Sequence, residues 1–338
     1  MKKIINRPQD VTNELFEGFL LAYGDKYKYK RVAGVRGFTV AGKKEKTALL
    51  VGGGSGHEPL FTGLAGGGMA DAIAAGDIFA SPDPNTILEV TKAANMGKGV
   101  LYVYGNYAGD NLNFRMAAEL AELQGIDVKI VTVSDDVSSA PFDRREERRG
   151  IAGDIFVVKI AGAATENGYD LERAHNVTRK AAENTRSIGI ALSPGSIPGQ
   201  DFTFTIGDDE VEYGMGLHGE PGVSRQKIQA ADVMVNKMME DLLADFRLIP
   251  GDEVCVLVNG LGSTTLMELL IMYRTVNKIL LENEIAIHDV DVNSYCTTQE
   301  MAGASITLFK LDGELGKLYD FPADAPYYKK FQGFCGRR

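Results

Sequence analysis

The sequence has few cysteines, no basic stripe and no long apolar run. Its three cysteines, Cys255, Cys296 and Cys335, are odd in number and widely spaced, which fits neither a disulfide framework nor zinc-ligand spacing. The net charge of -10 argues against a nucleic-acid or anionic-membrane partner. No stretch has the apolar length of a signal peptide or a membrane span. We therefore expect a cytoplasmic protein.

Length and patterning predict an α/β protein. A chain of 338 residues exceeds the size at which one core usually stops growing. Strand patterns alternate with helical spacing, which indicates largely parallel pairing. In the first half, strands are predicted at residues 47–51, 100–104, 128–133 and 155–160, and helices at 114–123, 161–168 and 171–185. We expect two α/β domains, each a sheet flanked by helices, at 1–190 and 191–338.

The second half repeats the same theme after a segment rich in proline and glycine. Residues 187–192 lead into that segment, and the domain boundary is placed beside it. The predicted elements that follow are helices at 230–243 and 264–282 and strands at 253–258, 286–292 and 305–311.

His57 lies in a glycine-rich run, GGGSGHEP at 52–59, directly after a predicted strand. Open α/β sheets present ligand-binding loops at such strand ends. The run is not a Walker A loop, because His-Glu-Pro follows its last glycine instead of Lys-Ser/Thr, and it does not match the dinucleotide fingerprint. A tight turn without a ligand is the alternative interpretation.

Asp110 follows another predicted strand, in NYAGDN at 106–111. It either caps a helix that begins near Leu112 or acts as a general base on a substrate hydroxyl. If the two strands are neighbours, His57 and Asp110 form an acid/base pair.

His218 lies in GMGLHGEPG at 214–222 and, like His57, is followed by a Glu-Pro pair. The segment is too rich in glycine for a stable helix interior, so it is either a surface turn or a loop packed closely around a small ligand. His175 and His288 lack such context and are interpreted as structural.

Two further segments have ordinary explanations. The run NGLGSTT at 259–265 joins a strand to a helix, with Ser263 or Thr264 as N-cap, and its amides could equally hold an anion. The mixed-charge run RREERR at 144–149 is typical of a solvated loop or an interface patch.

Four motifs, in order and over nearly the whole chain, resemble the dihydroxyacetone-kinase family and within it the ketose-binding DhaK subunits. These are GGSGHEP at 53–59, NYAGD at 106–110, RRGIAG at 148–153 and GLHGEPG at 216–222. The resemblance implies two α/β domains, a homodimer, and a ketose bound to His218 as a covalent hemiaminal. It further implies that His57 and Asp110 bond the substrate hydroxyls, with Asp110 as the base. It also implies substrate contacts at Gly54, Ser55, Gly56 and Gly105.

The sequence contains no Walker loop, kinase signature or metal-binding carboxylate cluster, although phosphoryl transfer needs a charge-neutralising donor site. The resemblance implies that ADP or ATP and Mg²⁺ sit on a separate helical subunit of the DhaL type, since the length leaves no room for a fused domain. A phosphohistidine donor of the phosphotransferase system (DhaM type) would recharge that subunit. We expect no cofactor or metal in this chain, which would be a kinase subunit that is inactive alone.

Gly105 departs from the family pattern, because the resemblance places a lysine there. Its loss makes room and removes a cation, which leaves open a longer ketose such as erythrulose. A non-catalytic, ketose-sensing coactivator is a further alternative, and the retained His57 and Asp110 favour the kinase. The missing dinucleotide fingerprint disfavours an NAD(P) oxidoreductase.

Overall fold

Short runs of β-branched and small apolar residues form the centre of a first six-stranded sheet, in the order β1-β2-β4-β3-β5-β6. The computed structural model describes residues 2–42 and 45–331. The strands are β1 (Tyr29–Arg31), β2 (Gly37–Val40), β3 (Ala48–Ser55), β4 (Ala72–Ile78), β5 (Val100–Gly105) and β6 (Val128–Val133). Strands β4, β3, β5 and β6 pair in parallel. Because β3 and β5 are parallel neighbours, His57 and Asp110 both follow the carboxyl ends of adjacent strands.

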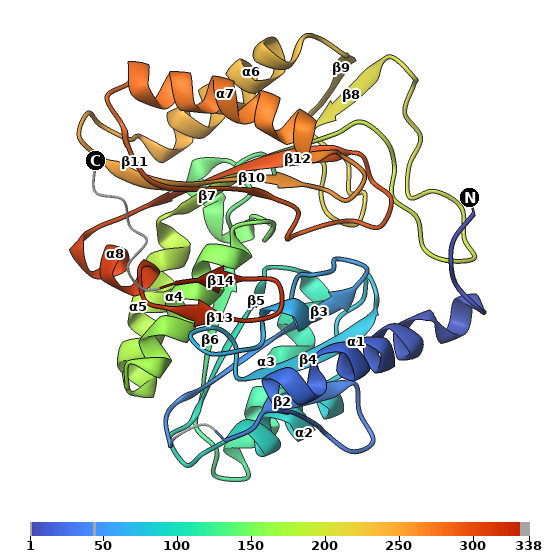
Figure 1. Ribbon diagram of the computed structural model, residues 1–338, viewed down its shortest axis with the longest axis vertical. Coiled ribbons are helices and arrows are strands. Elements are labelled where there is room, and N and C mark those ends of the chain that lie inside the picture. Colours follow the sequence, from blue (N-terminus) through green and yellow to red (C-terminus); the bar gives the residue numbers. More distant parts are fainter. Residues whose placement is uncertain (1, 43–44, 332–338) are drawn as a thin grey trace.

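Helices cover both faces of this sheet (Figure 1). They are α1 (Val11–Tyr27), α2 (Pro84–Ala94), α3 (Ala108–Glu122), α4 (Asp154–Glu166) and α5 (Leu171–Glu183), with 3-10 turns at Pro8–Asp10, Thr62–Leu64 and Phe142–Glu147. Helices α2 and α3 share an apolar cluster with Tyr102 and Tyr104 of β5. Helix α4 contributes to a second cluster, which continues to the other half of the chain.

The prediction of a strand at 155–160 is wrong, since these residues lie in α4. The whole stretch Asp154 to Thr165 is buried, and Phe156 stacks on Phe309 of the second sheet at 5.3 Å between ring centroids. A helix enclosed on all sides is apolar on all sides, so it loses the helical periodicity by which it would be recognised.

The second sheet has the order β11-β10-β12-β7-β8-β9. Its strands are β7 (Thr185–Ala191), β8 (Glu210–Tyr213), β9 (Ser224–Lys227), β10 (Glu253–Gly260), β11 (Ala286–Asn293) and β12 (Gly303–Lys310). Helices α6 (Ala231–Phe246) and α7 (Leu266–Glu282) cover its outer face (Figure 1). Pairing within this sheet is parallel between β10 and β11 and antiparallel elsewhere, so the expectation of largely parallel strands holds for the first sheet and fails for the second.

The two halves are interlocked at the end of the described chain. Helix α8 (Gly313–Tyr319) packs on α4, and a bridge pairs Gly67 with Asp324. The short strands β13 (Ala323–Asp324) and β14 (Lys329–Lys330) pair with each other beside the first half. Strand β7 belongs to the second sheet. The predicted division into domains 1–190 and 191–338 would assign nearly all of β7 to the first domain. That division stays a prediction.

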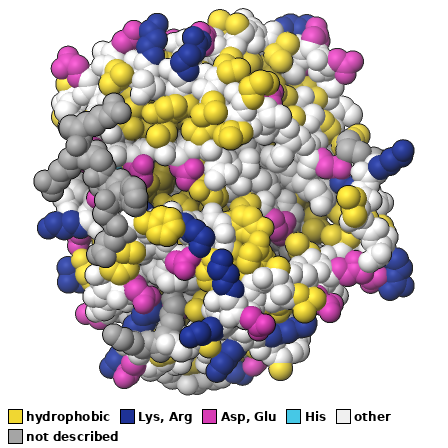
Figure 2. Space-filling view, in the orientation of Figure 1, with side chains coloured by type: hydrophobic (Ala, Val, Ile, Leu, Met, Phe, Trp, Pro, Cys, Tyr) yellow, Lys and Arg dark blue, Asp and Glu magenta, His cyan; other side chains and the backbone are white. Residues whose placement is uncertain are grey.

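The surface carries charges of both signs. On the face in Figure 2, Lys and Arg side chains are interspersed with Asp and Glu. Within residues 2–42 and 45–331, no helix is both long enough and apolar enough to span a membrane.

A buried ion cluster joins the two halves beside the motif at 148–153. Arg148, 1% exposed, bonds Asp245 of α6 through both terminal nitrogens, Nη1 at 3.0 Å and Nη2 at 2.5 Å. Arg186 of β7 donates to the same carboxylate at 2.8 Å. The prediction of a solvated loop or an interface patch at 144–149 fits the exposed residues Arg144 to Glu147, whereas Arg148 and Arg149 lie inward, on Asp245 and Asp136. Arg148 lies inward because the half-buried carboxylate of Asp245 faces it.

Replacing Asp245 with Asn should lower the free energy of unfolding by about 3 kcal/mol, because two buried guanidinium groups lose their counter-charge. Denaturant titration at neutral pH measures the loss. Asp241→Asn is the matched control on the same helix: its exposed pair with Lys237 spans 3.7 Å and should contribute at most about 0.5 kcal/mol. Equal effects of the two substitutions would contradict the assigned role.

Candidate active site

The glycines that precede His57 lie where the neighbouring chain leaves no room for a side chain. A Cβ atom on Gly53 would lie 2.3 Å from the Phe61 ring, and one on Gly54 would lie 2.8 Å from the Ala80 nitrogen. Gly56 has a φ of +96°, which favours glycine. The glycine run thus brings the end of β3 against the residues that follow β4, and it delivers His57 to the interior.

The His57 ring is 3% exposed, and the chain holds its orientation. Its Nδ1 lies 2.7 Å from the carbonyl oxygen of Thr297, so Nδ1 carries the hydrogen and donates it. Burial, with the nearby charge of His218, lowers the pKa of His57 to about 3. At neutral pH, His57 is therefore a neutral imidazole whose Nε2 lone pair is available as an acceptor.

His218 lies in the loop between β8 and β9, and its Nε2 is 3.0 Å from Nε2 of His57. Its Nδ1 lies 3.0 Å from Oε1 of Glu220, whose Oε2 accepts from the His218 backbone amide at 2.9 Å. Burial would raise the pKa of Glu220, but its bonds to His218 prevail and lower that pKa to about 2. The carboxylate therefore keeps a hydrogen on Nδ1 of His218 and turns Nε2 toward His57.

A hydrogen bond between two Nε2 atoms needs one proton. His57 already uses its hydrogen at Nδ1, so the bridging proton belongs to His218, where the Glu220 carboxylate balances the charge. Once that proton leaves, Nε2 of His218 presents a lone pair to the same space. Such an oriented imidazole can act as a nucleophile.

Asp110 lies in the first turn of α3, and the interpretation of Asp110 as the helix cap is wrong. The helix begins earlier than expected, with Tyr107 as N-cap and Asp110 inside the helix. Its Oδ1 is buried and has no hydrogen-bond partner among the described residues. Burial raises the pKa of Asp110 to about 6, although Ser81 and the charge of His218 act in the opposite direction. A carboxylate that titrates near 6 suits a general base.

Aromatic rings enclose the two imidazoles. The Tyr107 ring centroid lies 4.7 Å and that of Phe79 lies 5.6 Å from the His218 centroid, and Phe79 is also 5.0 Å from His57. Sequence reasoning missed both rings and the Thr297 carbonyl. It noted that Glu-Pro follows each histidine without seeing that Glu58 and Glu220 each accept a bond from a backbone amide two residues earlier.

The remaining predicted substrate-binding positions border this site, and their role stays a prediction. Ser55 directs its hydroxyl away, to the Gly76 carbonyl at 2.8 Å. Gly56 donates its amide to Glu58 at 2.9 Å. Gly105 ends β5 close to Gly150, whose own Cβ would lie 2.6 Å from the Gly105 Cα.

The other polar residues that the sequence singled out cap a helix or bond to groups within the chain. Thr265, not Ser263 or Thr264, caps α7, in a capping box with Glu268 that uses the amides proposed for an anion. His175 bonds the Ile130 carbonyl, and His288 pairs with acidic side chains.

The thiols and the possible metal ligands form no second centre in the described ranges. Cys255 and Cys296 are free and buried, and Cys335 lies outside the described residues. Residues 2–42 and 45–331 contain no cluster of three or more His, Cys, Asp or Glu side chains suited to a metal.

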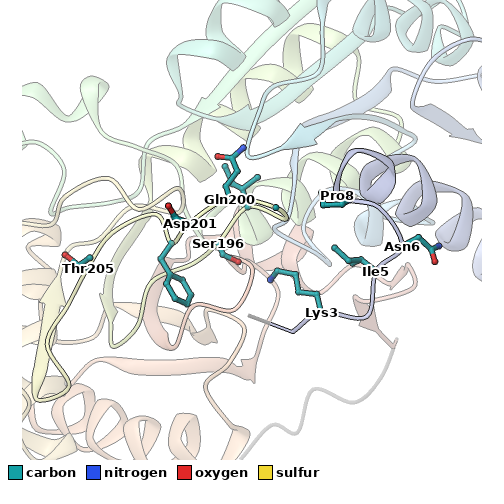
Figure 3. A pocket seen from close by; sticks show the side chains of 11 residues that line it. Lys3, Ile5, Asn6, Pro8, Ser196, Gln200, Asp201 and Thr205 are labelled. Atoms are coloured by element: carbon teal, nitrogen blue, oxygen red, sulfur yellow. The ribbon is translucent and has the colours of Figure 1, made fainter.

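A surface hollow of about 810 Å³ lies elsewhere, between the N-terminal segment and the loop around 196–205 (Figure 3). Its one cationic lining group, Lys3, already pairs with Glu300 at 2.5 Å, and Ser196 bonds the same carboxylate. None of the imidazoles lines it.

Comparisons with known proteins show the family of the chain. A family model, described as the Dak1 domain, matches residues 17–327. The dihydroxyacetone-binding subunit DhaK of a phosphotransferase-system-dependent dihydroxyacetone kinase from Listeria innocua is 42% identical over 97% of this chain and 99% of its own length. The L-erythrulose kinase of Pectobacterium atrosepticum is 39% identical over 98% of this chain, which spans 56% of that enzyme.

A solved structure resembles the whole fold. The dihydroxyacetone kinase of C. freundii, in complex with AMP-PNP and Mg²⁺, superposes with a TM-score of 0.89 and 31% identity. The match covers 97% of this chain and 61% of that one. The predicted α/β class, with two helix-flanked sheets, is confirmed.

His57 should stay neutral throughout the physiological range. Its pKa is lowered to about 3, so its ¹⁵N chemical shifts should stay constant from pH 8 down to about pH 4 and change only below that. Nuclear magnetic resonance of ¹⁵N-histidine-labelled protein measures this, and His57→Asn assigns the signal among the four histidines. A His57 signal that titrates near 6.5 would contradict the assigned burial and tautomer.

Proposed function

This chain belongs to the Dak1-domain family, and we propose that it is the substrate-binding subunit of a ketose kinase of the dihydroxyacetone-kinase type. It binds a small ketose covalently on His218 and presents a ketose hydroxyl to a phosphoryl group that a partner supplies. The observation that carries this proposal is the pair of Nε2 atoms 3.0 Å apart, each oriented by a bond at its own Nδ1.

The covalent step balances within the site. The bridging proton passes from Nε2 of His218 to Nε2 of His57 at 3.0 Å. This frees the His218 Nε2 lone pair, which forms a bond to the ketone carbon while the π electrons of the carbonyl move to its oxygen. That oxygen takes up the proton that bridged the two imidazoles. The product is a hemiaminal on a cationic ring, and the Glu220 carboxylate at 3.0 Å balances the charge both before and after. Glu220 is thus a positioning residue.

Covalent attachment explains how so small a ligand is held. A three-carbon sugar offers little surface to bind, and a reversible bond anchors it in one orientation for the next step. Addition requires a carbonyl group, so the site selects ketones and aldehydes over polyols such as glycerol.

Asp110 and His57 have different roles in phosphoryl transfer. With a pKa of about 6, Asp110 is mostly ionised at neutral pH and can take the proton of the attacking hydroxyl. His57, neutral at that pH, accepts a hydrogen bond through Nε2 and holds a substrate hydroxyl in place.

The phosphoryl donor belongs to a partner in this proposal. The described residues provide no cluster of ligands suited to Mg²⁺, so the proposal assigns nucleotide and metal to the partner. A helical nucleotide-binding subunit of the DhaL type would dock over the histidine pair, recharged by a phosphohistidine donor of the DhaM type. The working unit would contain a homodimer of this chain and would be inactive without its partner.

Replacing His218 with Ala should abolish covalent binding. With dihydroxyacetone ¹³C-labelled at the carbonyl carbon, the wild-type protein should convert the ketone signal into that of a tetrahedral carbon, as measured by ¹³C nuclear magnetic resonance. His175→Ala, which removes a structural imidazole, should leave the tetrahedral signal intact. A tetrahedral signal that persists in His218→Ala would refute the assigned nucleophile.

Replacing Asp110 with Asn should lower the rate of phosphoryl transfer about 10²- to 10⁴-fold while the tetrahedral ¹³C signal persists, since only the base is lost. Assays with the cognate nucleotide-binding subunit measure the rate. In the wild type, the rate should fall about tenfold per pH unit below about pH 6, because protonated Asp110 cannot accept the hydroxyl proton. A wild-type protein that forms the adduct but supports no transfer would instead be a non-catalytic ketose sensor.

A further inference from the structure

Two consecutive residues in the connection between β11 and β12 contact both histidine loops. Thr297 bonds the first loop three times. Its carbonyl accepts from Nδ1 of His57 at 2.7 Å, its amide donates to the His57 carbonyl at 3.3 Å, and its hydroxyl donates to the Glu58 carbonyl at 2.8 Å. Thr298, 0% exposed, donates its hydroxyl to the Leu217 carbonyl at 2.6 Å. The reaction above assigns no role to the Thr298 hydroxyl.

The Leu217 carbonyl belongs to the peptide unit that precedes the nucleophile. The N–H of the same unit is the His218 amide, which donates to Oε2 of Glu220 at 2.9 Å. A trans peptide unit is planar, with its N–H and its C=O pointing in opposite directions, so these two bonds together oppose its rotation. Glycine at 214, 216, 219 and 222 would otherwise leave the loop many backbone conformations. The Thr298 hydroxyl therefore helps to fix the direction in which the His218 ring points.

A buried amide side chain anchors the segment that carries Thr298. Asn259 of β10 is 0% exposed. Its Oδ1 accepts from the amides of Tyr295 and Cys296 at 2.8 Å and 2.9 Å. Its Nδ2 donates to the Cys296 carbonyl at 2.7 Å and to the Ser305 hydroxyl at 3.3 Å. All four hydrogen-bonding positions of the amide are thus used, and the backbone that leads to Thr298 is tied to the second sheet.

We propose that Thr298 is a positioning residue for covalent attachment, because its hydroxyl holds the peptide unit of His218 so that Nε2 stays 3.0 Å from Nε2 of His57. The inference rests on the proposed function, in which a proton passes between these two atoms before the nitrogen attacks the ketone. A displaced His218 ring would lengthen that path and would meet the carbonyl carbon in the attacking geometry less often. Thr298 is fully buried and acts through the Leu217 carbonyl.

The test measures the equilibrium constant for adduct formation from the tetrahedral ¹³C signal of labelled dihydroxyacetone, at several sugar concentrations. Thr298→Val keeps the branched shape but lacks the hydroxyl, so the constant should fall about tenfold, the usual effect of one lost hydrogen bond. Thr298→Ser keeps the hydroxyl and should restore most of the constant. Thr298→Ala adds no bulk, should show the same loss as the valine variant, and replaces it if that variant does not fold.

The kinetics should show the same loss in one parameter only. With the cognate nucleotide-binding subunit, Thr298→Val should raise the KM for dihydroxyacetone about tenfold and leave kcat close to that of the wild type, because an adduct that has formed still meets Asp110. The ¹⁵N signals of His57 should remain those of the neutral ring with hydrogen on Nδ1, since Thr297 keeps its three bonds.

Thr185→Val is the matched control. Thr185 of β7 is also 0% exposed and donates its hydroxyl to a backbone carbonyl, that of Ala181, at 2.8 Å. Its replacement should lower the free energy of unfolding about as much as Thr298→Val does, as measured by denaturant titration. The adduct constant should nevertheless equal that of the wild type.

Three results would overturn the positioning role and leave the proposed function standing. These are an unchanged adduct constant in Thr298→Val, an equal loss in Thr185→Val, and a failure of Thr298→Ser to restore the constant. A changed His57 tautomer in Thr298→Val would also overturn it, because the hydroxyl would then hold the whole segment and not His218 in particular. Absence of a tetrahedral ¹³C signal in the wild type would instead refute the proposed function.

Discussion

The contact between Nε2 of His57 and Nε2 of His218, at 3.0 Å, is the constraint on which the rest of the site depends. The two rings come from different sheets, so the contact exists only if both halves of the chain are held in a fixed relation. The segment after β11 provides one such link, because Thr297 accepts from His57 and Thr298 donates to the Leu217 carbonyl. Arg149 provides another, through its bonds to Asp136 and to the Gly214 carbonyl.

The pKa values of four ionisable groups within one buried region are shifted in different directions. His57 is neutral because burial disfavours its cation, and Glu220 stays ionised because it bonds the ring and the backbone of His218. The bond from Ser81 to Asp110 does not offset burial, and Oδ1 of Asp154 has no partner among the described residues, so burial raises the pKa of both carboxyl groups. The hydrogen bonds that reach each carboxylate therefore decide whether burial raises its pKa.

Sequence reasoning found the elements whose signals are local. The strands at 100–104 and 128–133 and the helix at 230–243 match β5, β6 and α6 with small shifts at the ends. It failed where tertiary contacts override the local pattern. Helix α4 is enclosed on all sides, so its apolar run gave no periodicity, and Arg148 is buried because a carboxylate from α6 faces it.

The sequence by itself determined the family, the α/β class and the two histidine loops, because unusual glycine and histidine motifs survive as local strings. Only the tertiary structure decided what each residue faces. It placed Phe79, Tyr107 and the Thr297 carbonyl around the imidazoles, and it brought Asp154 beside Gly105. The physical reason is that tautomer, pKa and unpaired hydrogen-bonding capacity are set by burial and by neighbours distant in the chain. Residue spacing does not encode these neighbours.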